Sequence, residues 1–288
     1  ERLAAAIRDA GPALSFFRHG DKRLACFHGG HESEGVLVDL ALARVDRDAR
    51  PPTRSIEAGF DRLHAGRTLV LVDSGLPTAK GFDRGGHSSP LAIEFSDGAQ
   101  RIVVNCGAPA DGSAPWNELA RATAAHSTVT VNDVHAVEID KGGGVRSGGL
   151  NVQARRSEGE EGLWLDVSHD GYVTPFGLIH RRRLYLPRGG GDLRGEDLLE
   201  GNAGWPFSLR FHLHPDVKAK LEAGAVQLTL PGRQQWRFSA AGGRLSLGPS
   251  IYLGDGRRRN TQAILVEGRT GAEGAAVKWA FRAEGRRG

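Results

Sequence analysis

The sequence predicts a mainly β protein, built as one large antiparallel β-sandwich. The 288 residues include 41 Gly and 13 Pro, and many of them form short turn-like clusters that suit many short strands. After Ser55 the apolar residues follow a period of two, the period of a strand with one buried face. No long amphipathic helix follows Arg121, which disfavours a parallel βαβ fold.

The N-terminal residues show a different pattern. Residues 1–17 predict a helix with apolar residues on one face, kinked at Gly11-Pro12. One short helix cannot form a domain, so we expect the tail of a helical domain. The chain starts at Glu1 and contains no Met, and we therefore expect a piece of a longer protein. We divide it into residues 1–54, the helical tail and a linker with a second short helix over 36–45, and residues 55–288, the sandwich.

The sandwich opens with two predicted hairpins. Strands over 60–64 and 67–73 flank the turn Ala65-Gly66, and strands over 91–95 and 101–105 flank Asp97-Gly98. The remaining predicted strands cover 127–131, 163–167, 178–186, 207–213, 226–230, 235–238, 244–247, 263–267 and 277–282.

Composition excludes several classes of protein. The formal charge of +4 is mild, and the sequence lacks the aromatic and basic fingerprints of nucleic-acid modules. No apolar run approaches the ~20 residues of a membrane span. Cys26 and Cys106 are far apart and give no zinc spacing, so we expect two free, buried thiols.

One strand places several polar side chains in a row. In Phe207–Pro215, Phe207, Leu209, Phe211 and Leu213 alternate with Ser208, Arg210, His212 and His214. The row can bind a metal or an anion, or form an ordinary polar outer face. We favour the polar face, because no carboxylate or third His lies close in sequence.

Three further segments contain histidines. His87 follows two glycines before a strand, where a His can be a general base or an ordinary loop residue. His126 starts a strand after a short helical stretch, as a buried His would. His169–Tyr172 forms a turn ahead of the Arg-rich strand Leu178–Leu186. No nucleophile elbow, P-loop or dinucleotide fingerprint is present.

Taken in order, these segments resemble the heparinase II/III C-terminal family of polysaccharide lyases over roughly residues 50–285. The resemblance rests on Gly86–Ser89, Arg101–Gly107, Ala124–Val131, His169–Tyr172, His180–Leu186 and Phe211–Pro215. It implies a helical (α/α) toroid before a supersandwich-like β domain, with an acidic polysaccharide bound in the cleft between them. It also implies a periplasmic or cell-envelope location.

The resemblance also implies residue roles. His87 matches the catalytic His of the family. Ser89 and Asn105 stand where a zinc-binding His and Asp are expected, and only His126 remains of the three ligands, so we predict no metal. We predict substrate contacts from Arg121, His126 and Tyr172.

The implied reaction is β-elimination at a uronic acid, with the Tyr acid and the carboxylate-neutralising groups supplied largely by the toroid. A non-catalytic sandwich that binds a glycan or an envelope partner is the competing hypothesis. A purely structural β domain is the third.

Overall fold

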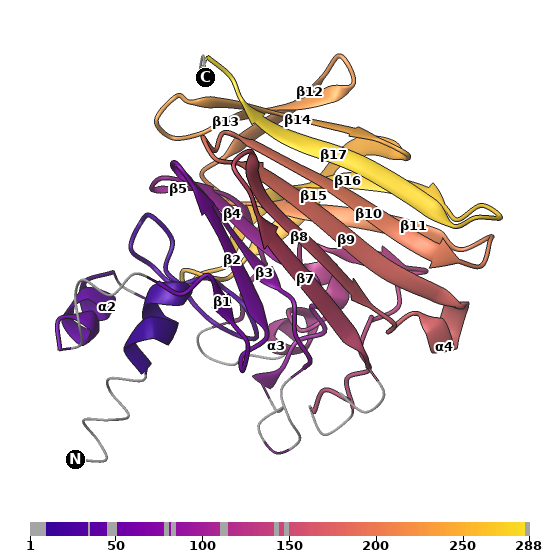
Figure 1. The fold of residues 1–288 in the computed structure, drawn as a ribbon, viewed down its shortest axis with the longest axis horizontal. Helices are drawn as coiled ribbons and strands as arrows, with labels where there is room; N and C mark the ends of the chain where they lie inside the picture. The colour runs from indigo at the N-terminus through magenta and orange to yellow at the C-terminus, as the bar shows by residue number, and fades with distance from the viewer. Residues whose placement is uncertain are drawn as a thin grey trace.

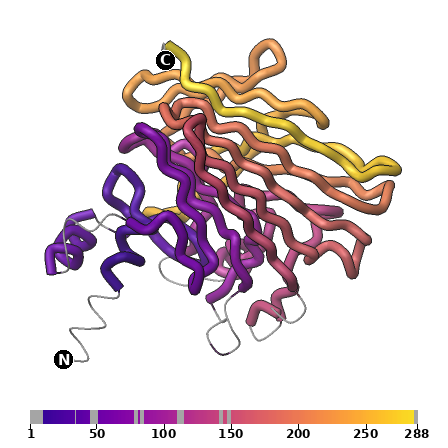
Figure 2. Tube along the Cα trace, in the orientation of Figure 1, coloured from indigo at the N-terminus to yellow at the C-terminus, as the bar shows by residue number. Residues whose placement is uncertain are grey.

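The computed structural model describes residues 10–33, 35–44, 51–77, 81, 85–109, 115–140, 144–146 and 150–285. Two large antiparallel sheets face each other (Figure 1), which confirms the predicted sandwich. The N-terminal segment and the helix α2 (Gly35–Leu42) lie beside one sheet, as the trace in Figure 2 shows. None of the helices formed by these residues has the length and apolar character needed to cross a membrane.

The nine-stranded sheet forms one layer of the sandwich and combines strands from both ends of the chain. Its order is β1-β2-β3-β4-β5-β11-β16-β15, with β6 paired to β11. The strands are β1 (Arg54–Ser55), β2 (Phe60–Ala65), β3 (Thr68–Asp73), β4 (Ile93–Asp97), β5 (Gln100–Val104), β6 (Val129–Val131), β11 (Pro206–Leu213), β15 (Arg244–Tyr252) and β16 (Arg259–Arg269).

The eight-stranded sheet has the order β12-β13-β14-β17-β10-β9-β8-β7. Its strands are β7 (Val152–Glu158), β8 (Gly162–His169), β9 (Leu178–Pro187), β10 (Asp192–Gly201), β12 (Lys218–Glu222), β13 (Ala225–Thr229), β14 (Gln235–Ala241) and β17 (Ala275–Ala283). The chain also forms α3 (Trp116–Leu119), the 3-10 helix η2 (Thr123–Ala125) and α4 (Val173–Phe176).

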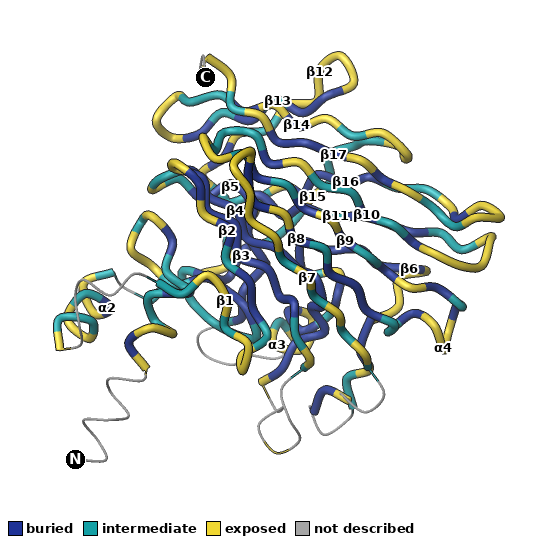
Figure 3. The backbone as a smooth tube through the Cα atoms, in the orientation of Figure 1, coloured by how far each residue is buried: buried dark blue, intermediate teal, exposed yellow. Residues whose placement is uncertain are grey.

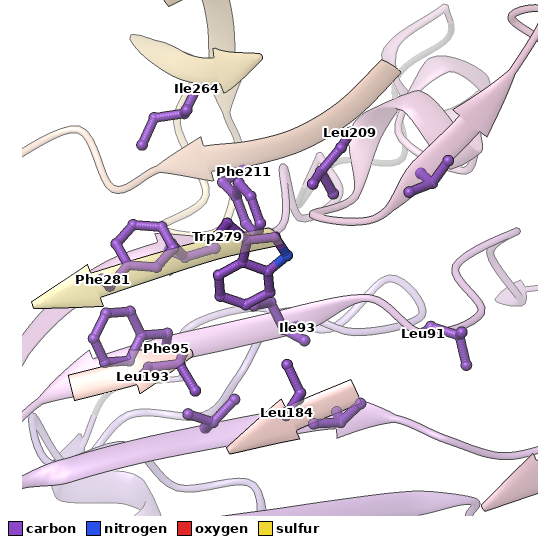
Figure 4. Packing of buried hydrophobic residues seen from close by; sticks show 14 of the residues in the cluster. Leu91, Ile93, Phe95, Leu184, Leu193, Leu209, Phe211, Ile264, Trp279 and Phe281 are labelled. Carbon is purple, nitrogen blue, oxygen red and sulfur yellow. The ribbon is translucent and has the colours of Figure 1, made fainter. Parts of the chain in front are cut away.

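The main core lies between the two sheets. Aromatic residues meet at its centre, where Phe211 of β11 contacts Trp279 and Phe281 of β17 with ring centroids 4.8 and 5.4 Å apart (Figure 4). Figure 3 shows buried stretches along the central strands and exposed ones at the turns. The period-two pattern in the sequence therefore indicates which side chains of each strand face the other sheet.

A smaller core fixes the N-terminal segment on the outer face of the nine-stranded sheet. Its buried members are Phe16, Ala25, Phe27, Phe60, Leu69, Leu71 and Ala92. Arg101 of β5 donates to Asp21 at 2.8 Å and to the Leu24 carbonyl at 2.9 Å. The part of the predicted linker around residues 18–32 is thus packed against the sandwich, whereas the boundary after residue 54 stays a prediction.

The helices and cysteines agree with the sequence in part. Residues 10–16 are helical, and the beginning of the predicted 1–17 helix lies outside the described residues. The second predicted helix is confirmed as α2. Cys26 and Cys106 are buried free thiols, as predicted.

Candidate active site

The loop before β4 presents His87 by a tight set of hydrogen bonds. The hydroxyl of Ser89 donates to Asp73 Oδ2 at 2.7 Å, and the Leu91 N–H donates to the Asp73 carbonyl at 2.9 Å. Leu91 adopts a positive φ of 60°, which is strained for a residue with a bulky side chain. Such strain persists only where neighbouring groups hold it, and it lies four residues from His87.

A second histidine orients the imidazole of His87. His87 Nδ1 lies 3.0 Å from His126 Nε2, and His126 Nδ1 lies 2.8 Å from the Ala122 carbonyl. Because the carbonyl only accepts, His126 carries its proton on Nδ1, and its neutral Nε2 accepts the proton of His87 Nδ1. The lone pair of His87 therefore lies on Nε2, which has no hydrogen-bond partner among the described residues.

The backbone of His87 is held from the opposite side by His28. The His87 N–H donates to His28 Nδ1 at 3.1 Å, and His28 Nε2 lies 3.2 Å from Asp73 Oδ2. A side chain at Gly29 would begin 3.6 Å from His87 Nε2. Gly29 therefore places no side-chain atom against this nitrogen, and His87 as a whole is buried, with 3% of its surface exposed.

The segment carrying His126 is fastened to the loop and to the sheet. Ser88 and Thr123 share a hydrogen bond between their hydroxyls at 2.7 Å, and Arg121 Nε donates to the Gly86 carbonyl at 2.8 Å. His212 Nε2 lies 3.0 Å from the Ala124 carbonyl, to which it donates. The loop with His87 and the η2 segment with His126 therefore form one rigid unit.

Burial sets the protonation of these histidines. It lowers the pKa of His87 well below its usual range, and electrostatic interactions with His126, His28 and Arg121 act in the same direction. Burial likewise lowers the pKa of His126 to about 3. Both rings are neutral at pH 7, which is the state that a proton-accepting Nε2 requires.

The positions of the family zinc ligands do not fit a zinc ion. Ser89 donates to Asp73, while the side chain of Asn105 donates to Glu94 Oε1 at 3.3 Å and accepts from the Ser127 N–H at 3.0 Å. His126 Nε2 is occupied by His87. Among the described residues no group of three or more His, Cys, Asp or Glu side chains could hold a metal. The prediction of a metal-free protein stays a prediction.

The predicted substrate contacts stay predictions, and the structure shows where their side chains lie. Tyr172 is fully buried in the core, and its hydroxyl donates to the Val129 carbonyl at 3.0 Å, which gives it a structural role there. Arg121 and His126 are also buried and hold the Gly86 carbonyl and His87, respectively. Their geometry makes them positioning residues.

The polar side chains of β11 lie opposite the core, as the alternation predicts, but His212 is not exposed. It is buried, because its Nε2 donates to the Ala124 carbonyl of η2 and its Nδ1 lies 2.7 Å from the hydroxyl of Ser250 in β15. The sequence analysis missed His28 and Asp73. His28 lies in a polar loop and Asp73 at the end of an apolar strand, so no local pattern in the sequence singles either out.

A buried polar network connects the site to the other sheet. Arg182 of β9 pairs with Asp197 of β10 at 2.8 Å and donates to the carbonyls of Leu91 and Ser127 at 2.7 and 2.9 Å. Asp197 also accepts from His180 at 2.7 Å. Arg182 therefore holds both the strained turn before β4 and the residue after His126.

Comparisons with known proteins agree with this architecture. A family model described as "Heparinase II/III-like, C-terminal" matches residues 47–280. The crystal structure of heparinase III superposes with a TM-score of 0.73 at 12% identity, covering 97% of this chain and 48% of that one. A mutant of heparan sulfate lyase HepC from Pedobacter heparinus gives 0.73 at 13% identity, covering 96% and 46%. At such low identity these two structures show the fold.

A relative with higher identity is the FtsZ-localized protein C of Caulobacter vibrioides (strain NA1000 / CB15N). It is 30% identical over 307 residues, which cover 99% of this chain and 53% of the relative. This chain therefore spans about half the length of that protein.

Proposed function

The chain belongs to the heparinase II/III-like C-terminal family, and from that premise we propose that it forms the sandwich half of a polysaccharide lyase. The proposed substrate is a uronic-acid-containing polysaccharide of the periplasm or cell envelope. The observation that carries the proposal is the hydrogen bond from His87 Nδ1 to His126 Nε2. It leaves a neutral imidazole whose Nε2 can accept a proton.

In the proposed reaction, His87 Nε2 takes the C5 proton of the uronic acid. The electron pair of that C–H bond forms the C4=C5 double bond, and the bond from C4 to the leaving oxygen breaks. The leaving oxygen receives a proton from an acid outside this chain, as the resemblance to the family implies. The C5 proton becomes acidic only when the neighbouring carboxylate is neutralised, so that cation or donor also comes from outside the described site.

The His126 partner has a specific task in this step. When His87 becomes protonated, Nδ1 still donates to His126, so the ring keeps its orientation through proton transfer. The fixed orientation avoids the reorganisation that a freely rotating His would need. His28 contributes by holding the backbone N–H of His87.

The test uses the natural-length protein and a panel of uronate polymers. Elimination creates an unsaturated sugar that absorbs in the ultraviolet, so product formation is followed directly. We expect His87→Ala to lower kcat/KM about a hundredfold or more, whereas the exposed His64 on β2 provides the matched control His64→Ala, with no change. An active enzyme whose two variants behave alike would exclude His87 as the base.

The second candidate is a non-catalytic envelope module. Two observations favour it: the 30% identity with a protein named for its localisation with FtsZ, and the side chains of Ser89 and Asn105, which are bonded elsewhere. On this hypothesis the natural-length protein binds glycan without forming unsaturated product, and a fluorescent fusion co-localises with FtsZ in cells.

A further inference from the structure

The outer face of the eight-stranded sheet contains a groove of about 780 Å³. The pairing register places Trp164, Tyr185, Arg194, Ala280 and Ser239 directly opposite one another, on strands β8, β9, β10, β17 and β14. Residues directly opposite in antiparallel strands share a face, so these five form one row across the sheet. At about 4.8 Å between strands, the row spans about 19 Å.

Two aromatic rings form one end of this row. The Trp164 side chain is 50% exposed, and its ring lies 4.3 Å from that of Tyr185 at 37°. The Arg194 guanidinium lies 5.8 Å from the Tyr185 ring centroid. An exposed indole held in place by a neighbouring ring is a rigid apolar platform, which binds a flat apolar surface at low entropic cost.

The other end of the row has small side chains, those of Ala280 and Ser239. Two residues further along the same strands, Ala241 pairs with Lys278 and also lines the groove. The groove is therefore bounded by the aromatic platform on one side and open above small residues on the other. Its size suits a ligand of several rings.

The charges beside the groove neutralise one another. Arg183 donates to Asp166 at 3.3 Å and to Glu196 at 3.2 Å. Arg194 and Arg282 both pair with Asp192, at 2.6 and 3.3 Å. The face thus offers fixed donors and acceptors side by side without an excess of positive charge. This pattern suits hydroxyl groups, which both donate and accept, and does not suit a polyanion such as nucleic acid or a sulfated glycan.

We propose that this groove is a second saccharide-binding site, which takes an uncharged segment of an oligosaccharide laid across the strands. The apolar face of a pyranose ring stacks on Trp164, and neighbouring hydroxyls bond to the paired side chains of Arg183 and Glu196. The site does not depend on the proposed lyase activity. The groove is lined by residues of the eight-stranded sheet, whereas His87 precedes β4 of the other sheet and does not line the groove.

The experiment is isothermal titration calorimetry of the full chain with cellohexaose, chitohexaose and mannohexaose, and with hexagalacturonate as the charged probe. We expect at least one neutral hexasaccharide to bind, with a Kd that is nearly the same at low and high salt. Trp164→Ala should raise that Kd at least tenfold, and Trp164→Phe should retain most of the affinity. Trp116→Ala removes a partly buried indole outside the groove and should leave the Kd unchanged.

Circular dichroism of each variant verifies the fold, which should persist because half of Trp164 faces solvent. The proposal fails if no neutral hexasaccharide binds, or if the Trp164→Ala protein binds as well as the original. It also fails if hexagalacturonate alone binds and salt abolishes that binding, because the groove would then recognise the negative charge of the ligand and not its hydroxyl groups. A loss of lyase activity in His87→Ala with unchanged hexasaccharide binding separates this site from the proposed active site.

Discussion

Replacing Arg182 by Met tests how strongly the second sheet supports the site. The Arg182 side chain is fully buried and pairs with Asp197, which is 2% exposed. Burial alone raises the pKa of Asp197, and the charge of Arg182 with the His180 hydrogen bond outweighs it and lowers that pKa to about 2. Removing the cation leaves a buried carboxylate without its counter-charge and two carbonyls, of Leu91 and Ser127, without a donor.

The magnitude follows from this burial. Breaking a buried ion pair by removing one partner lowers the free energy of unfolding by about 3–5 kcal/mol. Because two buried carbonyls also lose their donor, we expect a value at the upper end of this range. The neighbouring Arg183 points outward and is 47% exposed, so Arg183→Met should cost less than about 1 kcal/mol. The free energy of unfolding is measured in urea by tryptophan fluorescence.

Two further measurements make this prediction specific. Adding Asp197→Asn to Arg182→Met should recover part of the loss, because the uncompensated charge disappears. The pair stabilises the fold above the unfolded pKa of Asp, near 3.9, and this contribution is lost as the pH falls toward 2. The difference in the free energy of unfolding between the original protein and Arg182→Met should therefore become smaller in acid. A loss below about 1 kcal/mol, or equal losses for the two Arg variants, would refute the reasoning.

The remaining predictions concern the histidines, Tyr172 and zinc. Burial lowers the pKa of His126 to about 3 and that of His212 to about 4. Below pH 6.5 the unfolded chain binds protons that the folded chain excludes, so stability should fall on acidification by up to about 1.4 kcal/mol per pH unit for each group. Urea melts between pH 7 and 5 measure this, and a flat profile would contradict the buried neutral state. Tyr172→Phe removes one buried hydrogen bond and should lower the free energy of unfolding by about 1 kcal/mol. Any lyase activity should stay unchanged, and a rise in KM alone would instead support a contact between Tyr172 and the substrate. Elemental analysis of the purified protein should find no stoichiometric zinc, and one zinc per chain that is lost in His126→Ala would show that the side chains rearrange around a metal.

The sequence predicted most of the sandwich because its strands alternate clearly. It missed β10, a central strand, because Asp192–Gly201 contains polar residues on both faces. Asp197 faces the core there, and its position becomes intelligible only with Arg182 and Trp279 beside it. Because a charged residue occupies an inward position, β10 does not show the apolar alternation by which the other strands were predicted.

The site was predicted less completely, for a related reason. His87 stands out beside its glycines, but its orientation depends on His126 and His28, which come from other parts of the chain. The alternation in β11 assigned Phe211 correctly to the core, yet the other face carries His212, which the η2 segment covers. Period-two patterns describe one strand and its sheet, and they carry no information about a loop that packs over the opposite face.

The dispersed origin of the site has a consequence for the order of folding. The contact from His87 to His28 joins residues 59 positions apart, and the contact from Arg182 to Leu91 joins residues 91 positions apart. Such distant contacts form late, because the closing of long loops loses chain entropy before the contact contributes stability. During synthesis the loop of His87 lacks its support until β9 has emerged. The His87 amide, bonded to His28, should therefore exchange its hydrogen only when the whole sandwich opens.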